Sequence, residues 1–439
     1  MHLVGTSPQI TPAGRAAADD GLVFDTHKPS KESDATIRVA FIGAGGINFG
    51  KPGRPWNHVR AVSSIPGVQV VGIADPDTTL VRERIREKLQ GPEADKWQDC
   101  EAFTDYHGLI AARNRPEAVI IGVPPFCHGG MGPDNCMELD LARAGIHLFV
   151  EKPVSIQSAE EVGRLSDALE ECHTHNGSIV VVGYMLRYSA WIDAAKQLLK
   201  EAGAIPVAVV ARMSAGHSFT AKPAFWDIAR SGGPIVEQAT HFIDLMRYIC
   251  GEISADTIHA VALGPNLRLA DMAPPPQSEH QVPMERRINR ATAATWCFEG
   301  GAIGSLFHSI VLEGSRFTAE LDIFCDGMHL VIGNPYFEPS LRVRRGRCED
   351  YEQVDVGDGG DMFAEEMRVF IQAARTGERS LLRSTYSDAA RSYQCTKWVT
   401  SASIQTPKSA STAATPWITS NSHADAAISK AADLTPASI

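Results

Sequence analysis

The chain has 439 residues, of which 44% are hydrophobic and 21% charged, and its formal net charge is −11 at pH 7. This length exceeds what one hydrophobic core requires, so two domains are expected. The acidic balance argues against a nucleic-acid partner or a membrane-surface partner, because proteins that bind these usually carry a basic face. No apolar run is long enough for a membrane span or a secretory signal, and a cytoplasmic protein is therefore expected.

Nine cysteines are scattered along the chain, and no two of them form a C-x-x-C pair. Structural zinc sites usually draw their ligands from such closely spaced pairs. The pattern therefore predicts reduced thiols rather than disulfides, and no metal site.

Residues 1–34 are rich in Ser, Thr, Pro, Ala and Asp without a hydrophobic period, so we expect an extension that is disordered or drapes over the surface. From residue 37 onward, short β-branched runs end in Gly, Asp or Pro, and segments of helical composition separate them. The alternation predicts a doubly wound parallel sheet, a Rossmann domain over residues 35–155. The runs cover residues 37–46, 68–77, 118–125 and 147–153.

The pattern changes after residue 155. One helix leads to longer strands of alternating polarity, which are joined by tight glycine turns without helices between them. Residues 156–402 are therefore predicted to form an α+β domain with a large, mostly antiparallel sheet. Two segments of helical spacing, 363–377 and 387–402, are expected to pack back onto the body. Residues 403–439 have the composition of a low-complexity tail.

A glycine-rich turn follows the first predicted strand directly, at the position of a G-x-G-x-x-G fingerprint. In that fingerprint the glycines let the backbone approach a pyrophosphate, whose charge meets the N-terminus of the next helix. We expect cofactor contacts from Gly43, Gly45, Gly46 and Ile47, and also from Asn48, which replaces the third glycine. A simple glycine turn after a strand is the alternative interpretation.

Asp75 closes the second predicted strand, where a carboxylate can accept hydrogen bonds from the hydroxyls of the adenosine ribose. Its distance from the glycines along the chain is longer than usual, and the Pro/Gly-rich segment 49–57 accounts for the excess. A carboxylate here repels a 2′-phosphate, so NAD(H) is favoured as the cofactor, while the nearby Arg82 and Arg84 leave NADP(H) open. The alternative is an aspartate that only ends the strand.

Several further motifs follow the glycine turn along the chain. The most specific is the Glu-Lys-Pro sequence at 151–153, which follows an A-x-x-G-x-H segment. The others are Val123-Pro124-Pro125 with His128, Val182-Gly183-Tyr184, Arg187-Tyr188, Gly232-Gly233, and Glu237 with His241 and Asp244. In these motifs the chain resembles the Gfo/Idh/MocA family, which includes glucose-fructose oxidoreductase and inositol dehydrogenase, and the likeness covers residues 37–402.

The resemblance implies that Lys152 reaches the substrate hydroxyl beside the nicotinamide, while Pro124, His128 and Glu151 contribute to the cofactor pocket. An ammonium at that place lowers the cost of a developing alkoxide and holds the reacting oxygen in line with the hydride acceptor. Without this context, Glu151 and Lys152 would be interpreted as a solvated charge pair.

His241 resembles the family's proton-transferring histidine, and Glu237 precedes it by four residues on one predicted helix. At this spacing the two side chains share a helix face, so the carboxylate can orient the imidazole or bind substrate hydroxyls. A neutral histidine is suited to take the proton of an alcohol as the hydride leaves. A histidine that only packs in the core is the alternative.

The chain also departs from the family near these residues. The family usually has Asp at the position of Glu237 and Gly at that of Ala239, and it often has Asn at that of Met185. The sugar specificity of the family is therefore not transferred to this chain. Aromatic and charged side chains near the motifs are expected to contact the substrate, with packing as the alternative for each: Tyr184, Arg187, Trp226, Asp244 and His308.

The sequence therefore predicts an NAD(P)-dependent oxidoreductase that transfers a hydride between nicotinamide and a carbinol or carbonyl carbon of a sugar, polyol or related small molecule. Two other functions stay open: an NAD-dependent glycosidase or lyase that uses the hydride only transiently, and a non-catalytic dinucleotide-binding regulator. A regulator is expected to lose Lys152 or His241, and both are present. The resemblance also implies a homodimer or homotetramer formed through the antiparallel sheet.

Overall fold

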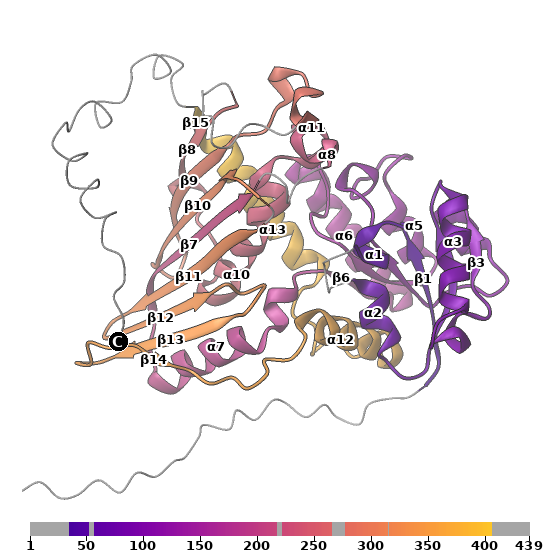
Figure 1. The fold of residues 1–439 in the computed structure, drawn as a ribbon, viewed down its shortest axis with the longest axis horizontal. Helices are drawn as coiled ribbons and strands as arrows, with labels where there is room; N and C mark the ends of the chain where they lie inside the picture. Colours follow the sequence, from indigo (N-terminus) through magenta and orange to yellow (C-terminus); the bar gives the residue numbers. More distant parts are fainter. Residues whose placement is uncertain (1–34, 52–56, 217–221, 266–276, 315, 406–439) are drawn as a thin grey trace, which may run out of the picture.

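The computed structural model describes residues 35–51, 57–216, 222–265, 277–314 and 316–405. It contains a parallel sheet wrapped by helices and a larger sheet that carries helices on one face (Figure 1). This arrangement confirms the predicted fold class, a Rossmann domain with an α+β domain. The extension 1–34 and the tail after residue 405 lie outside the described residues. Within the described part, no helix is both long and apolar enough to cross a membrane.

The first sheet has six parallel strands in the order β3-β2-β1-β4-β5-β6. Hydrophobic clusters cover both of its faces, which explains why all four residues of β4 are apolar and buried. The strands are β1 (Ile37–Ile42), β2 (Val68–Ala74), β3 (Glu101–Phe103), β4 (Ala118–Ile121), β5 (His147–Val150) and β6 (Val180–Val182). The helices are α1 (Gly46–Phe49), α2 (His58–Ser63), α3 (Thr78–Leu89), α4 (Tyr106–Ala111), α5 (Met137–Arg143) and α6 (Ala159–Asn176).

The parallel sheet continues past the expected domain boundary at residue 155. Ser158 caps the start of α6 by accepting a hydrogen bond from the backbone N–H of Glu161, and Gly177 ends the helix in the left-handed region. Strand β6 then pairs in parallel with β5 and becomes the edge of the sheet. The Rossmann sheet therefore ends at residue 182, because the crossover through α6 returns the chain to the same sheet.

The second sheet has nine strands in the order β14-β13-β12-β11-β7-β10-β9-β8-β15. Most neighbours are antiparallel, whereas β7 runs parallel to β10 and β8 parallel to β15. Its inward side chains form one core with helices α7 and α10. The strands are β7 (Pro206–Gly216), β8 (His259–Leu263), β9 (Ala291–Cys297), β10 (Ile303–Leu312), β11 (Phe317–Cys325), β12 (Met328–Gly333), β13 (Ser340–Arg345), β14 (Glu352–Gln353) and β15 (Ser403–Gln405). The helices of this region are α7 (Ala190–Ala202), α8 (Pro223–Trp226), α9 (Ile228–Ser231), α10 (Thr240–Cys250) and α11 (Gln277–His280).

Two C-terminal helices, α12 (Met362–Thr376) and α13 (Tyr386–Ala402), pack back onto the body of the molecule and contact helices of the Rossmann domain. Helix α12 lies against α2 and contributes Phe370 and Ile371 to the core of the first sheet. Helix α13 packs along α6. After α13, strand β15 adds to the second sheet beside β8, so the segment from residue 403 begins as an edge strand and not as a tail.

Candidate active site

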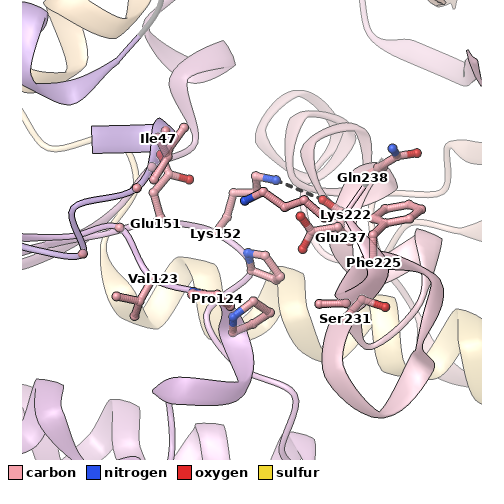
Figure 2. A pocket seen from close by; sticks show the side chains of 18 of the residues that line it. Ile47, Val123, Pro124, Glu151, Lys152, Lys222, Phe225, Ser231, Glu237 and Gln238 are labelled. Carbon is pink, nitrogen blue, oxygen red and sulfur yellow. Dashed lines mark hydrogen bonds between the residues drawn. The ribbon is translucent and has the colours of Figure 1, made fainter. Parts of the chain in front are cut away.

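A cavity of about 590 Å³ lies between the carboxyl edge of the parallel sheet and the segment from α8 to α10. Figure 2 shows the wall from the Rossmann domain facing the wall from the second domain, with Lys152 reaching between them. The residues directly after five of the six parallel strands line this cavity: Gly43, Asp75, Gly122, Glu151 and Gly183. This crevice is where open α/β sheets bind their ligands.

The glycine turn forms the part of the wall that follows β1. Gly43 has a φ of +95°, and a Cβ added there would lie 2.7 Å from the carbonyl oxygen of Gly122, so no side chain fits. A Cβ on Gly45 would meet no described atom within 4 Å, which leaves the backbone open to an approaching ligand. Gly45 is also the N-cap of α1, and Gly46 and Ile47 line the cavity beside it.

Asn48 does not line the cavity, in contrast to the expectation from the fingerprint. Its side chain is fully buried, and its Nδ2 donates hydrogen bonds to the carbonyl oxygens of Ile42, at 3.0 Å, and Gly43, at 2.7 Å. Its amide lies against Gly122, where an added Cβ would be only 2.4 Å from Oδ1. Asn48 therefore stabilises the turn from the side opposite the cavity, because its amide bonds two carbonyl groups of the turn that a glycine could not reach.

Asp75 lies at the cavity and joins the end of β2 to the glycine turn. Its Oδ2 accepts a hydrogen bond from the backbone N–H of Ala44 at 2.8 Å, and its Oδ1 accepts one from Asp77 at 2.9 Å. Each carboxylate oxygen has a second lone pair, so Asp75 can still accept bonds from two ribose hydroxyls. Pro124 lines the cavity nearby.

His128 is buried away from the cavity. Its Nδ1 lies 2.6 Å from Oε1 of Glu138, whose Oε2 accepts a hydrogen bond from the backbone N–H of Gly129. His128 is not among the residues that line the cavity, although it was expected in the cofactor pocket. The imidazole turns to Glu138 because a buried carboxylate on α5 needs a donor, and the pair braces the loop that carries Pro124.

The Glu-Lys-Pro segment crosses from the first sheet to the second domain. Oε1 of Glu151 lies 2.7 Å from Nε2 of His58, a buried residue of α2 that the sequence reading missed. The Lys152 ammonium donates a hydrogen bond to the carbonyl oxygen of Glu237 at 3.0 Å, which is the dashed line in Figure 2. The peptide between Lys152 and Pro153 is cis. Lys152 thus holds its charge inside the cavity and keeps further N–H groups for a ligand.

Glu237 and His241 both line the cavity, but they do not belong to one regular helix. Glu237 lies in a π-helical turn, η5 (Ile235–Ala239), and His241 lies in the first turn of α10. Two glycines with positive φ, Gly232 and Gly233, precede Pro234, the N-cap of this turn. Wide turns of this kind are frequent at functional sites, because they shift one residue of a helix outward.

Three buried polar atoms around this part of the cavity have no hydrogen-bond partner among the described residues: Oε2 of Glu237, Nδ1 of His241 and the hydroxyl oxygen of Tyr336. Buried polar atoms are nearly always paired, so each of these can take a partner beyond the described residues, such as a bound ligand. Tyr336 comes from the loop between β12 and β13, and its ring lies edge-on to His241, with ring centres 5.9 Å apart. The sequence reading missed it, because a tyrosine in a strand connection carries no distinguishing pattern.

Burial controls the protonation of these groups. It lowers the pKa of His241 well below its usual value, and the Lys152 ammonium lowers it further, so the imidazole is neutral. Burial raises the pKa of Glu237, and Lys152 opposes that shift in part. The cavity therefore holds a neutral base beside a cation.

The expected substrate residues Arg187 and Asp244 brace the domain instead of lining the cavity. Nε and Nη2 of Arg187 donate to the two carboxylate oxygens of Asp244 at 2.8 and 2.7 Å, and both side chains are buried. The two side chains turn to each other because a buried charge needs a paired, hydrogen-bonded partner. Arg187 also donates to the carbonyl oxygen of Arg383 before α13, so this pair connects α10 to the C-terminal helices.

The expected aromatic contacts also point away from the cavity. The Tyr184 hydroxyl lies 2.8 Å from Oγ1 of Thr240, and its ring lies edge-on to His241, so it orients the imidazole from behind. Trp226 is fully buried in a separate apolar cluster, because its large ring is covered by β7 and β10. His308 is buried too, with its Nε2 2.8 Å from Oε1 of Gln238, a cavity residue that the sequence reading missed. Burial lowers the pKa of His308 to about 4.

Glu366 is a further cavity residue that the sequence reading missed. It lies on α12 and is 3% exposed. An acidic residue one turn before Phe370, on the apolar face of a predicted helix, is the signal that would have identified it.

Comparison with known proteins matches two consecutive segments of the chain to protein families. Residues 37–184 match the family described as "Oxidoreductase family, NAD-binding Rossmann fold", and residues 187–328 match an oxidoreductase C-terminal domain family. The protein UNK4.17 of Schizosaccharomyces pombe is 31% identical over 395 residues, which are 86% of this chain and 95% of that protein.

Two groups of solved structures share the fold. KijD10, a 3-ketoreductase from Actinomadura kijaniata in complex with NADP and TDP-benzene, has a TM-score of 0.65 at 16% identity and covers 85% of this chain and 100% of its own. Levoglucosan dehydrogenase in complex with NADH and levoglucosan has a TM-score of 0.63 at 17% identity, over 84% of this chain and 97% of its own.

Proposed function

The chain belongs to the Gfo/Idh/MocA family of oxidoreductases with an NAD-binding Rossmann fold, and on this premise we propose that it transfers a hydride between nicotinamide and a carbinol or carbonyl carbon of a sugar or polyol. The observation that carries the proposal is the set of unpaired polar atoms on Glu237, His241 and Tyr336 beside the Lys152 ammonium. A polyhydroxylated ligand supplies partners for all of them at once. The solved relatives that bind TDP-benzene and levoglucosan support this substrate class.

The Rossmann wall of the cavity fits a dinucleotide. The backbone from Gly43 to Ile47 would hold the pyrophosphate, since Gly43 admits no side chain and Gly45 is open toward the cavity. Asp75 would accept bonds from the adenosine ribose hydroxyls, and Pro124 and Glu151 would line the nicotinamide end. When bound, the dinucleotide supplies the hydride acceptor or donor.

Lys152 and the residues of the second wall would act on the oxygen of the reacting carbinol or carbonyl group and on its proton. Lys152 is held by the carbonyl oxygen of Glu237 and donates another N–H to the reacting oxygen, which stabilises negative charge there. The neutral His241 accepts the hydroxyl proton as the carbinol is oxidised and returns it in the reverse direction. Glu237 and Tyr336 bind neighbouring hydroxyls and so fix which carbon faces the nicotinamide.

The test of this proposal is a screen of sugars and polyols with NAD⁺ and with NADP⁺, followed by absorbance in the NADH band. We expect net cofactor reduction with at least one polyol. NAD⁺ is expected to give the higher kcat/KM, because the Asp75 carboxylate repels a 2′-phosphate. Product formation without net reduction would instead identify a glycosidase or lyase with transient redox chemistry, and dinucleotide binding without any turnover would favour a regulator.

We also propose that the protein forms a homodimer through the outer face of the second sheet. Ile303, Ala208 and Phe324 lie in one row across β10, β7 and β11, and Phe307 and Val261 lie in a second row through β9. The four larger side chains in these rows are exposed although they are apolar, and such a patch marks an interface.

A charge in the centre of this face is expected to separate the subunits. Phe307→Asp should shift the protein from dimer to monomer in sedimentation velocity, because it replaces an apolar contact by a carboxylate that association would have to desolvate. Leu89→Asp, an exposed apolar residue at the end of α3, serves as the matched control and should leave the dimer intact. A wild-type monomer, or a dimeric Phe307→Asp variant, would contradict the proposed interface.

A further inference from the structure

Glu366 places a buried carboxyl group at one end of the cavity without a role in the chemistry above. Its side chain is 3% exposed, and its Oε1 has no hydrogen-bond partner among the described residues. The residue lies on α12, which follows the segments matched by the two families. Helix α12 packs against α2 and the turn η3 (Met185–Tyr188), and in this way it brings Glu366 to the carboxyl edge of the parallel sheet.

The surroundings of Glu366 favour its protonated form. Burial raises its pKa well above the usual value, the carboxylates of Glu151 and Asp244 raise it further, and a hydrogen bond with the backbone of Tyr184 opposes the shift in part. Glu151 and Asp244 already have their own partners, since His58 binds Glu151 and Arg187 binds Asp244. In its protonated form Glu366, which lines the cavity, has both an O–H donor and a C=O acceptor.

We propose that Glu366 binds the carboxamide of the nicotinamide and thereby fixes which face of the ring is turned toward Lys152 and His241. A primary amide carries one donor and one acceptor side by side, and a carboxyl group presents the complementary pair, so two parallel hydrogen bonds form. Glu366 lines the same cavity as Glu151, the residue directly before Lys152. The inference rests on the proposed function, because it assumes that the dinucleotide occupies this cavity.

Binding measurements separate this role from simple packing. Glu366→Leu removes both hydrogen bonds, so we expect the Kd for NADH to rise roughly tenfold or more while the Kd for ADP-ribose, which lacks the nicotinamide, stays unchanged. Glu366→Gln keeps one donor and one acceptor and should restore NADH binding to near the wild-type value. Once a substrate is known, the stereospecificity of hydride transfer can also be measured with 4-deuterated NADH. The wild type should transfer hydride from one face of the nicotinamide ring, whereas Glu366→Leu should transfer it from both faces.

A neighbouring acid and a dinucleotide analogue serve as controls for the role of Glu366. Glu365→Gln changes a neighbouring acid that pairs with Arg368 at the surface, and it should bind NADH like the wild type. The wild-type protein should bind nicotinic acid adenine dinucleotide roughly tenfold more weakly than NAD⁺, a test that needs no variant and so does not depend on how Glu366→Leu folds. Unchanged NADH binding by Glu366→Leu, equal losses for NADH and ADP-ribose, or equal binding of the two dinucleotides would overturn it. Because these readouts are binding constants, they stand whether or not a sugar is oxidised.

Discussion

Lys152→Ala is expected to lower kcat by about 10²–10³-fold or more while leaving the Kd for NADH nearly unchanged. The ammonium reaches the cavity from the end of β5 and is held by the carbonyl oxygen of Glu237, so its loss removes the donor that stabilises charge on the reacting oxygen. Within the described part of the chain, the glycine turn and Asp75, which would hold the dinucleotide, form no hydrogen bond with its side chain. Steady-state kinetics with the substrate found in the screen, together with NADH fluorescence titration, measures both quantities.

A lysine elsewhere on the surface provides the matched control. Lys200 lies exposed near the end of α7, away from the cavity, and Lys200→Ala should retain full turnover and NADH binding. Normal turnover of Lys152→Ala would exclude the proposed role of the ammonium. A parallel loss of NADH binding would show that Lys152 acts on the cofactor and not on the substrate oxygen.

His241→Asn is expected to lower kcat by about 10²–10⁴-fold, the usual contribution of a positioned general base. The direction of its pKa shift also sets the pH dependence of the wild-type enzyme. Because burial and Lys152 hold the pKa of His241 well below 6.5, the imidazole remains an unprotonated base through neutral pH. For alcohol oxidation, kcat/KM should therefore stay flat as the pH falls through 6.5 and decline only when His241 becomes protonated at lower pH.

The pH profile distinguishes this role from packing. His241→Asn should lower kcat and also abolish the decline of kcat/KM at acidic pH. His175→Asn, a change at an exposed position at the end of α6, should leave both the rate and this decline unchanged. A wild-type limb centred near the ordinary histidine pKa would contradict the buried, cation-facing position of His241. Residual activity with an unchanged limb in His241→Asn would assign the base to another group.

Local patterns in the sequence predicted the fold class and the residues at the centre of the site. β-branched runs closed by Gly, Asp or Pro identified the parallel strands, because the carboxyl ends of such strands must meet at one edge. The turn at Gly43 and the lysine at the end of β5 were therefore expected at the same edge. Lys152, Glu237 and His241 do line one cavity, while their chemical roles stay predictions.

The partners of the other polar side chains could not be derived in this way. His128, Arg187 and Asp244 were expected at the ligand because they belong to the same motifs, yet each one pairs with a buried charge. Whether such a side chain faces the ligand or pairs within the protein depends on which oppositely charged group a distant segment brings into contact. The short motifs of one sequence do not contain that information. The end of the first sheet could not be derived from the sequence for a similar reason. Only the pairing with β5 shows that β6 belongs to this sheet.

The sequence by itself determined the order of strands and helices, the glycine turn and the lysine and histidine of the candidate site, since these depend on periodicity and short motifs. The tertiary structure alone decided which polar groups face the cavity. Tyr336 reaches it from a loop of the second sheet and Glu366 from a C-terminal helix, and both positions result from packing between segments far apart in the chain. Burial in that packing also favours the neutral form of His241 and the protonated form of Glu366, because desolvation disfavours their charged forms.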